Sequence, residues 1–214
     1  MTGVWYHLRL VALRQAALAP ALVYVGLVAL VYASDAGPPV SAATVTAVAL
    51  MPTAAWLYRL VATVESLPFA DITLIRLHGR TRRQLTWMVS AVLLAAALGA
   101  AATGWARLAN PHPYPAPTLV LIGVLHLAQA LAGVGLGCLI SRPLPVPVGV
   151  AVLAVTSVVV VSLVVFWLPP LGPMLAAFAG RRATGQVQVL ALAETIGFGA
   201  VLAGTGWALD RSTV

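Results

Sequence analysis

The stretch "LTWMVSAVLLAAALGAAATGW", Leu85 to Trp105, contains no charged side chain. A helix needs about 20 apolar residues to cross the roughly 30 Å hydrocarbon core of a bilayer, so this stretch predicts a membrane span. The rest of the chain agrees, because 61% of its 214 residues are hydrophobic and only 8% are charged. Soluble proteins carry about 25% charged residues. The sequence therefore predicts an all-α integral membrane protein with one transmembrane domain over residues 1–214.

Further apolar runs of similar length lie on both sides of this stretch. The second run in the chain contains Pro52, which removes one backbone hydrogen bond and predicts a kink. The fifth run is rich in valine, but its length and lack of alternation favour a helix over a strand. In chain order, the six predicted transmembrane helices are residues 16–33, 41–63, 85–105, 118–140, 146–168 and 187–209.

Two segments outside these spans also carry helical patterns. Residues 3–15 have an apolar seam of Val4, Leu8 and Val11 beside two arginines, which predicts an N-terminal interfacial helix. A simple positively charged flank of the first span is the alternative. Between the fifth and sixth spans, the moderately apolar "MLAAFAG" predicts a short helix in an outer re-entrant hairpin.

The arginines indicate how the chain is oriented. The net charge of +7 comes from arginine alone, and cytoplasmic loops collect basic residues. With the N-terminus inside, nine arginines face the cytoplasm and three face outward, which predicts a multi-pass plasma-membrane protein with both termini cytoplasmic. This topology explains the charge without a nucleic-acid partner. The nine are Arg9, Arg14, Arg59, Arg76, Arg80, Arg82, Arg83, Arg142 and Arg211, and the three are Arg107, Arg181 and Arg182.

The stretch between the second and third spans carries its own helix signals. Ser66 is a suitable N-cap, Pro68 suits the first turn, and Gly79 is a natural left-handed stop. The apolar residues of Phe69–His78 fall in two stripes, so one face can meet the membrane domain and the other a partner. An interfacial helix without a partner is the alternative.

The order of these parts resembles the membrane subunit of type V ABC exporters, which carry antibiotics, O-antigen or teichoic acid. The resemblance rests on "WLYRLVATVESLPFADITLIRLHGRTRRQLTWM", which is similar to that family's coupling helix with its flanks, and on the turn "GLGCLISRPLPVP". It implies a permease that pairs with a second permease copy and is driven by a separate ABC ATPase. ATP and Mg would be bound by that ATPase. The residues implied to couple to it are Glu65, Ser66, Phe69, Asp71, Ile72, Ile75 and Arg76.

The residues themselves argue against an enzyme. A phosphate-binding loop needs a lysine, and this chain has none. The run "GVGLG", Gly133–Gly137, lies inside a predicted span, where glycines favour close helix packing. The four histidines lack the spacing of metal ligands. We therefore expect no metal, cofactor or active site in this chain.

Three polar side chains inside the spans are candidates for a substrate path or gate. Glu194 is the one acidic residue within a predicted span, and an intramembrane carboxylate is a functional hypothesis by default. It could face an amphipathic substrate (a lipid-linked molecule, peptide or antibiotic), a partner subunit, or Arg181 and Arg182. His126 and Gln129 share a helix face and could bind substrate or link helices. The alternative functions are an ion- or proton-coupled transporter using Glu194, and an accessory membrane scaffold.

Overall fold

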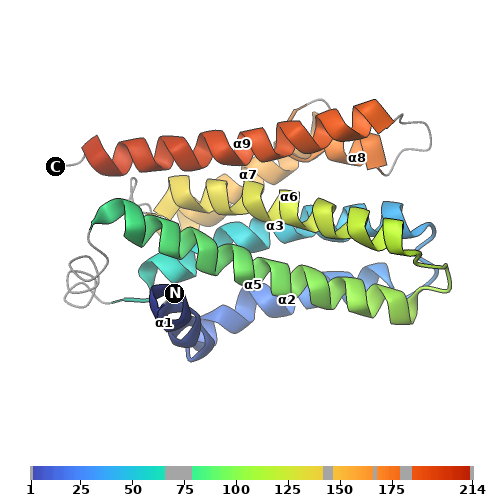
Figure 1. Cartoon of the computed structure of the whole chain (residues 1–214), viewed down its shortest axis with the longest axis horizontal. Helices are drawn as coiled ribbons and strands as arrows, with labels where there is room; N and C mark the ends of the chain where they lie inside the picture. Colours follow the sequence, from blue (N-terminus) through green and yellow to red (C-terminus); the bar gives the residue numbers. More distant parts are fainter. Residues whose placement is uncertain (1, 66–78, 142–146, 166–167, 179–184, 213–214) are drawn as a thin grey trace.

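A computed structural model describes residues 2–65, 79–141, 147–165, 168–178 and 185–212 of the chain. This described part is helical and contains no strand (Figure 1). The predicted coupling helix Phe69–His78 lies outside it. The helices are α1 (Thr2–Ala12), the 3₁₀ turn η1 (Gln15–Ala17), α2 (Leu18–Val31), α3 (Pro39–Thr63), α5 (Arg80–Ala109), α6 (Ala116–Ser141), α7 (Val148–Val164), α8 (Gly172–Phe178) and α9 (Gly185–Ser212).

Several of these helices have the length and composition to cross a bilayer. Among the described residues α3, α5, α6 and α9 qualify alone, and α1 with η1–α2 qualifies as a pair bent by 88°. The apolar helix α7 has only 17 residues. The described part of the chain is thus all-α, with four or five helices able to span a membrane. The count of six spans stays a prediction, because α2 and α7 are shorter than the predicted spans 16–33 and 146–168.

The centre of the bundle is the close contact of α6 with α3 on one side and α9 on the other. A methyl group added to Gly133 would overlap the backbone carbonyl of Met51 in α3, and one on Gly135 would overlap that of Gly199 in α9. A methyl group on Gly137 would lie 2.6 Å from the carbonyl oxygen of Ala55. Successive glycines of "GVGLG" therefore face α3 and α9 in turn, which confirms the predicted close helix packing.

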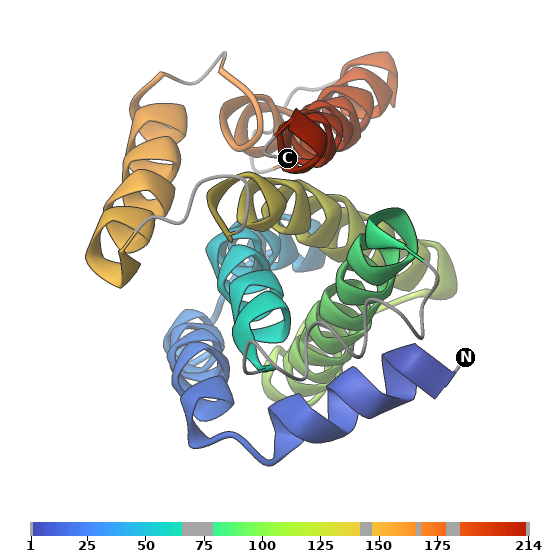
Figure 2. The same cartoon turned by 90° about the vertical axis from the view of Figure 1, so that its left-hand side faces the viewer.

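The N-terminal helix α1 lies across one end of the bundle, beneath α3 and α5 (Figure 2). We call this the α1 end. Its face toward the bundle is centred on His7 and Val11, which are buried, whereas Trp5 on the opposite face is 61% exposed. A helix is thus present where one was predicted over residues 3–15, but it ends at Ala12, and a histidine occupies the middle of its inner face.

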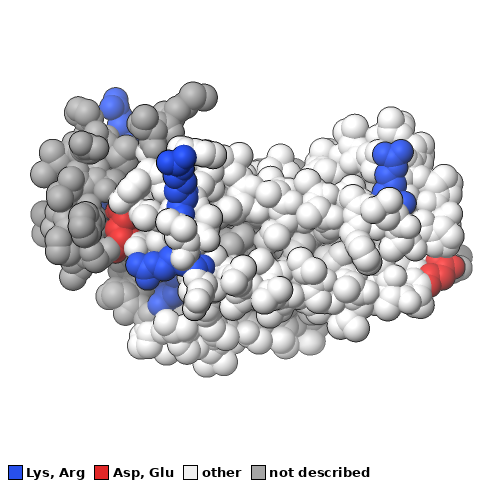
Figure 3. Space-filling model, turned by 90° about the horizontal axis from the view of Figure 1, so that it is seen from below, with Lys and Arg blue, Asp and Glu red and all other residues white. Residues whose placement is uncertain are grey.

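Apart from Glu194 in α9, the exposed charged side chains of the described residues lie at the two ends of the bundle. Figure 3 shows an uncharged band between them on the face in view. In the described part, the side chains of Arg9, Arg14, Arg80 and Arg82 are exposed at the α1 end, while Arg107 is exposed at the far end. An uncharged middle between charged ends is what a bilayer requires, since a charged group in hydrocarbon is costly.

The short helix α8 belongs to the hairpin between α7 and α9 at the far end. Its Met174, Ala177 and Phe178 are buried in one apolar cluster with Ala47 of α3 and Leu125 of α6. These two partners lie eight and nine residues from the far ends of their helices, or roughly 12 Å at 1.5 Å per residue. The hairpin therefore packs into the bundle and does not stand off it.

Candidate functional site

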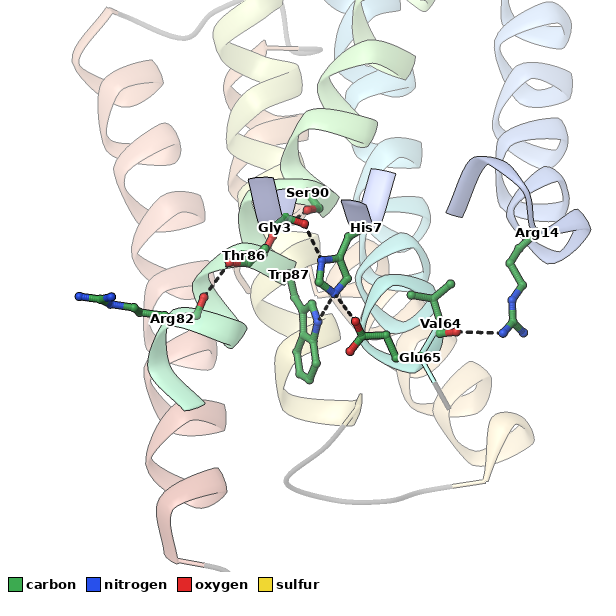
Figure 4. Close-up of polar contacts among 9 residues, drawn as sticks. All are labelled: Gly3, His7, Arg14, Val64, Glu65, Arg82, Thr86, Trp87 and Ser90. Carbon is green, nitrogen blue, oxygen red and sulfur yellow. Dashed lines mark hydrogen bonds and ion pairs between the residues drawn. The ribbon is translucent and has the colours of Figure 1, made fainter. Parts of the chain in front are cut away.

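A cluster of buried polar side chains lies at the α1 end, and we call His7, Glu65 and Trp87 the polar base. They come from α1, from the residues just after α3, and from the first turns of α5 (Figure 4). The His7 side chain is fully buried, and the Glu65 side chain is 1% accessible. Buried polar groups are costly unless they are paired, so the contacts inside this cluster determine its geometry.

The histidine is the centre of the polar base. Its Nδ1 lies 2.8 Å from the carbonyl oxygen of Gly3, one turn earlier in α1. The indole Nε1 of Trp87 donates to His7 Nε2 at 3.0 Å. Because a carbonyl only accepts and an indole N–H only donates, the ring carries its proton on Nδ1 and is neutral in this arrangement. The Glu65 Oε1 atom lies 3.5 Å from the same Nε2.

Two arginines contact residues in the polar base or next to it. The guanidinium of Arg14, which follows α1, donates to the backbone carbonyl of Val64 at 2.9 Å. The guanidinium of Arg83 lies over the Trp87 ring, 4.8 Å from its centroid, at the distance of a cation–π contact. The N-terminal segment thus contacts the end of α3 directly and reaches the start of α5 through His7. These are the two flanks of residues 66–78.

The predicted coupling residues fall into two groups, those that the structure describes and those that lie outside the described residues. Glu65 is the one that the structure describes, and its side chain faces His7 inside the chain. The other six, Ser66, Phe69, Asp71, Ile72, Ile75 and Arg76, lie outside the described residues. Sequence reasoning missed His7 and Trp87. The signals that could have found them are the four-residue spacings of His7 from Gly3 and Val11, and of Trp87 from Arg83, which place each pair on one helix face.

His126 occupies the contact between α3, α5 and α6. Its Nδ1 lies 2.9 Å from the carbonyl oxygen of Ile122, and its Nε2 lies 3.3 Å from the hydroxyl of Thr46 in α3. Its ring fills the space left by Gly99 of α5, where a methyl group would come within 3.1 Å of it. In this chain the side chain therefore links three helices.

Gln129 contacts a different neighbour, although it lies on the same helix as His126. Its Nε2 donates to the carbonyl oxygen of Pro170 at 3.3 Å, and the hydroxyl of Thr195 in α9 lies 3.2 Å from the same oxygen. Both contacts tie the hairpin between α7 and α9 to the bundle. The structure thus does not bring His126 and Gln129 to one common site.

Glu194 is exposed on α9 and lies apart from both of these side chains. The helix packs on the bundle through Ala191, Thr195 and Gly199, which leaves the face with Glu194 and Gly197 uncovered. Among the described residues Glu194 makes no hydrogen bond or ion pair, and the two arginines considered as its partners, Arg181 and Arg182, lie outside them.

An apolar groove opens between α2, α3 and α7. It has a volume of about 360 Å³ and is lined by Leu27, Pro52, Trp56 and Val155, with hydroxyls from Thr53 and Thr156. Pro52 lies inside α3, as the sequence predicts. The groove combines an apolar wall with a few polar groups, as sites for amphipathic molecules do.

The described residues contain no group of three His, Cys, Asp or Glu side chains placed to hold a metal ion. No protein-family model, curated protein or solved structure matches this chain. The class of protein therefore rests on the fold itself. The described residues of the chain are helical, and their long apolar helices are those of a membrane-embedded protein.

Proposed function

We propose that this chain is the permease subunit of an ABC exporter in the plasma membrane. In this proposal a separate ATPase docks on residues 66–78, a second half-permease completes the path, and an amphipathic molecule is the substrate. The observation that carries the proposal is the polar base, which ties both flanks of residues 66–78 to one N-terminal helix. A segment that receives force from a partner needs such an attachment.

The packing suggests how a push on this segment would reach the membrane region. α3 and α5 both pack against α6, and α3 contacts α6 through glycines with no room for a side chain. Closely packed helices move as units, because interiors deform little and shift between discrete arrangements. Closure of the ATPases would tilt α3 and α5 and so alternate access to a cavity between the two permeases.

Two surfaces support a partner chain and an amphipathic substrate. Only 17% of the apolar window of α9 is buried within the chain, against 61% for α6. A helix so little covered, with a carboxylate on its open face, fits a bundle completed by a second copy. The groove beside Pro52 and Trp56 has the mixed lining that an amphipathic molecule requires.

A reconstitution experiment tests this function. The tagged chain is purified from its own cells, and an ABC ATPase that copurifies is identified and returned with it to liposomes. We expect the chain to change the rate of ATP hydrolysis, and we expect Phe69→Asp to abolish both binding and this change. Leu108→Asp, an equally drastic change at the exposed far end, is the control and leaves binding intact. A chain that transports its substrate without any ATPase contradicts the proposal.

The alternative of a proton-coupled transporter is favoured by one observation, the exposed Glu194 on an apolar helix. It predicts that Glu194→Gln abolishes flux and its pH dependence in liposomes that contain the chain alone. Glu194→Asp, which keeps the carboxyl group, should retain part of the flux. If the chain alone gives no flux and no ATPase binds it, an accessory scaffold is the remaining function.

A further inference from the structure

A small pocket opens at the α1 end of the bundle, between the start of α5 and the end of α9. It has a volume of about 240 Å³, and part of its wall is apolar, with Leu85 and Met88 of α5 and Ala203 of α9. Thr81 and Trp207 line it as well, and the indole Nε1 of Trp207 donates to the Thr81 hydroxyl at 3.3 Å. Tryptophan is typical of the level at which a membrane helix meets the head groups of the lipids.

A buried amide group in this pocket lacks one hydrogen-bond partner. Gln84 lines the pocket and is only 6% exposed. Its Nε2 donates to the sulfur of Cys138 at 2.8 Å, but its Oε1 accepts no hydrogen bond within the part of the chain that the structure describes. A buried carbonyl oxygen without a donor costs free energy. A ligand that brings a hydroxyl group into the pocket would remove this cost.

Two exposed arginines lie between the pocket and the end of the bundle. Arg80 and Arg82 belong to the first turn of α5. Arg80 lies four residues before Gln84, and Arg82 lies three residues before Leu85, so each is one helical turn beyond a residue of the pocket. Figure 4 shows the Arg82 side chain pointing away from the polar base. The pocket therefore has positive charge on the side of the membrane surface and apolar residues toward the middle of the bundle.

We propose that this pocket binds a single-chain phospholipid that carries a free hydroxyl beside its phosphate, as a lysophospholipid does. The phosphate lies by Arg80 and Arg82, the glycerol hydroxyl donates to Gln84 Oε1, and the acyl chain lies along Leu85 and Met88. Charged, polar and apolar groups thus follow one another in the same order in the lipid and in the protein. Basic pockets between membrane helices bind anionic head groups in this way. Such a site needs no ATPase, so it is independent of the proposed function.

Native mass spectrometry of the purified chain in detergent tests the hydrogen bond to the lipid. The probes are 1-oleoyl lysophosphatidic acid and the same molecule without its free hydroxyl. We expect the wild type to retain the first about fivefold better, since only that lipid supplies a donor to Gln84. In Gln84→Met, which keeps the length of the side chain, the two lipids should be retained equally. Equal retention of both lipids by the wild type overturns the proposal.

Filling the pocket tests where the lipid binds. Gly204 lines the pocket, and a methyl group added to it meets no atom within 4 Å. We therefore expect Gly204→Leu to place its side chain in the pocket and to lower retention of lysophosphatidic acid at least tenfold. Gly197→Leu is the matched control, because Gly197 lies on the same helix, also in open space, and is not part of the pocket. Equal retention by these two variants overturns the proposal.

The arginines are tested by one substitution at each end of α5. We expect Arg82→Gln to lower retention of lysophosphatidic acid about fivefold, since a basic side chain near an anionic head group contributes that much. Arg107→Gln, the same change at an exposed arginine of the far end, leaves it unchanged. Equal losses in the two variants mean that retention follows the net charge of the chain, which overturns the proposal. Thermal unfolding in detergent checks that each variant is folded.

Discussion

At the scale of single residues, burial decides what a charged side chain can do. Glu65 stands at the start of the predicted coupling segment, where its charge suggests a contact with a partner. In the folded chain its side chain is 1% accessible and faces His7. A carboxylate taken out of water must be paired or hydrogen-bonded, so Glu65 first of all makes contacts within this chain. Glu194 is the opposite case, a carboxylate on an open helix face.

Glycine positions in α6 offer a direct test of the packing at this scale. A methyl group on Gly135 would overlap the backbone of Gly199, whereas one on Gly123 of the same helix meets no atom within 4 Å. We expect Gly135→Ala to lower the free energy of unfolding by about 1–3 kcal/mol, because backbone atoms cannot move aside as a flexible side chain can.

The measurement is chemical or thermal unfolding of the purified chain in a mild detergent. Gly123→Ala serves as the control, since it makes the same chemical change on the same helix in open space. Equal destabilisation by the two substitutions would mean that α6 and α9 do not approach each other as described here.

At the scale of elements, helix identity was predictable and helix ends were not. The run of apolar residues from Leu85 to Trp105 lies inside α5, which extends several residues further at each end. The sequence likewise predicted a helix at the N-terminus. The inner face of that helix is centred on His7, because His7 accepts a hydrogen bond there from the buried Trp87. Apolar periodicity does not detect a polar residue whose hydrogen bonds are completed by another helix.

The hairpin with α8 likewise shows what a local sequence pattern cannot predict. Its composition indicated a short helix that re-enters from the outer face, and α8 lies in that region. Its depth in the bundle depends on the cluster with Ala47 and Leu125, and on the carbonyl of Pro170 that accepts from Gln129. Those contacts join residues far apart in the chain, and no local pattern records them.

At the scale of the whole molecule, the arginines define an orientation that labelling can test. We expect Leu13→Cys to react with a membrane-impermeant maleimide only after the cells are opened, and Leu108→Cys to react in intact cells. Both positions are 84% exposed and lie at opposite ends of the bundle, and the native Cys138 is buried. Basic residues are retained on the cytoplasmic side, which is the physical reason for this expectation.

The parent chain, with Cys138 alone, should not be labelled before or after the cells are opened. Labelling of Leu13→Cys in intact cells would reverse the predicted orientation. Labelling of both added cysteines in intact cells would contradict a bundle that crosses the membrane.

The sequence by itself determined the class of this protein. Its apolar runs, its lack of charge and its GVGLG run predict an all-α membrane bundle with close helix contacts, because hydropathy and glycine spacing act locally along a helix. Only the tertiary structure decided which polar groups meet. It separated Gln129 from His126, turned Glu65 inward and joined it with His7 and Trp87. Those pairings depend on helices distant in the chain, since a buried polar group needs a partner that its own helix cannot supply.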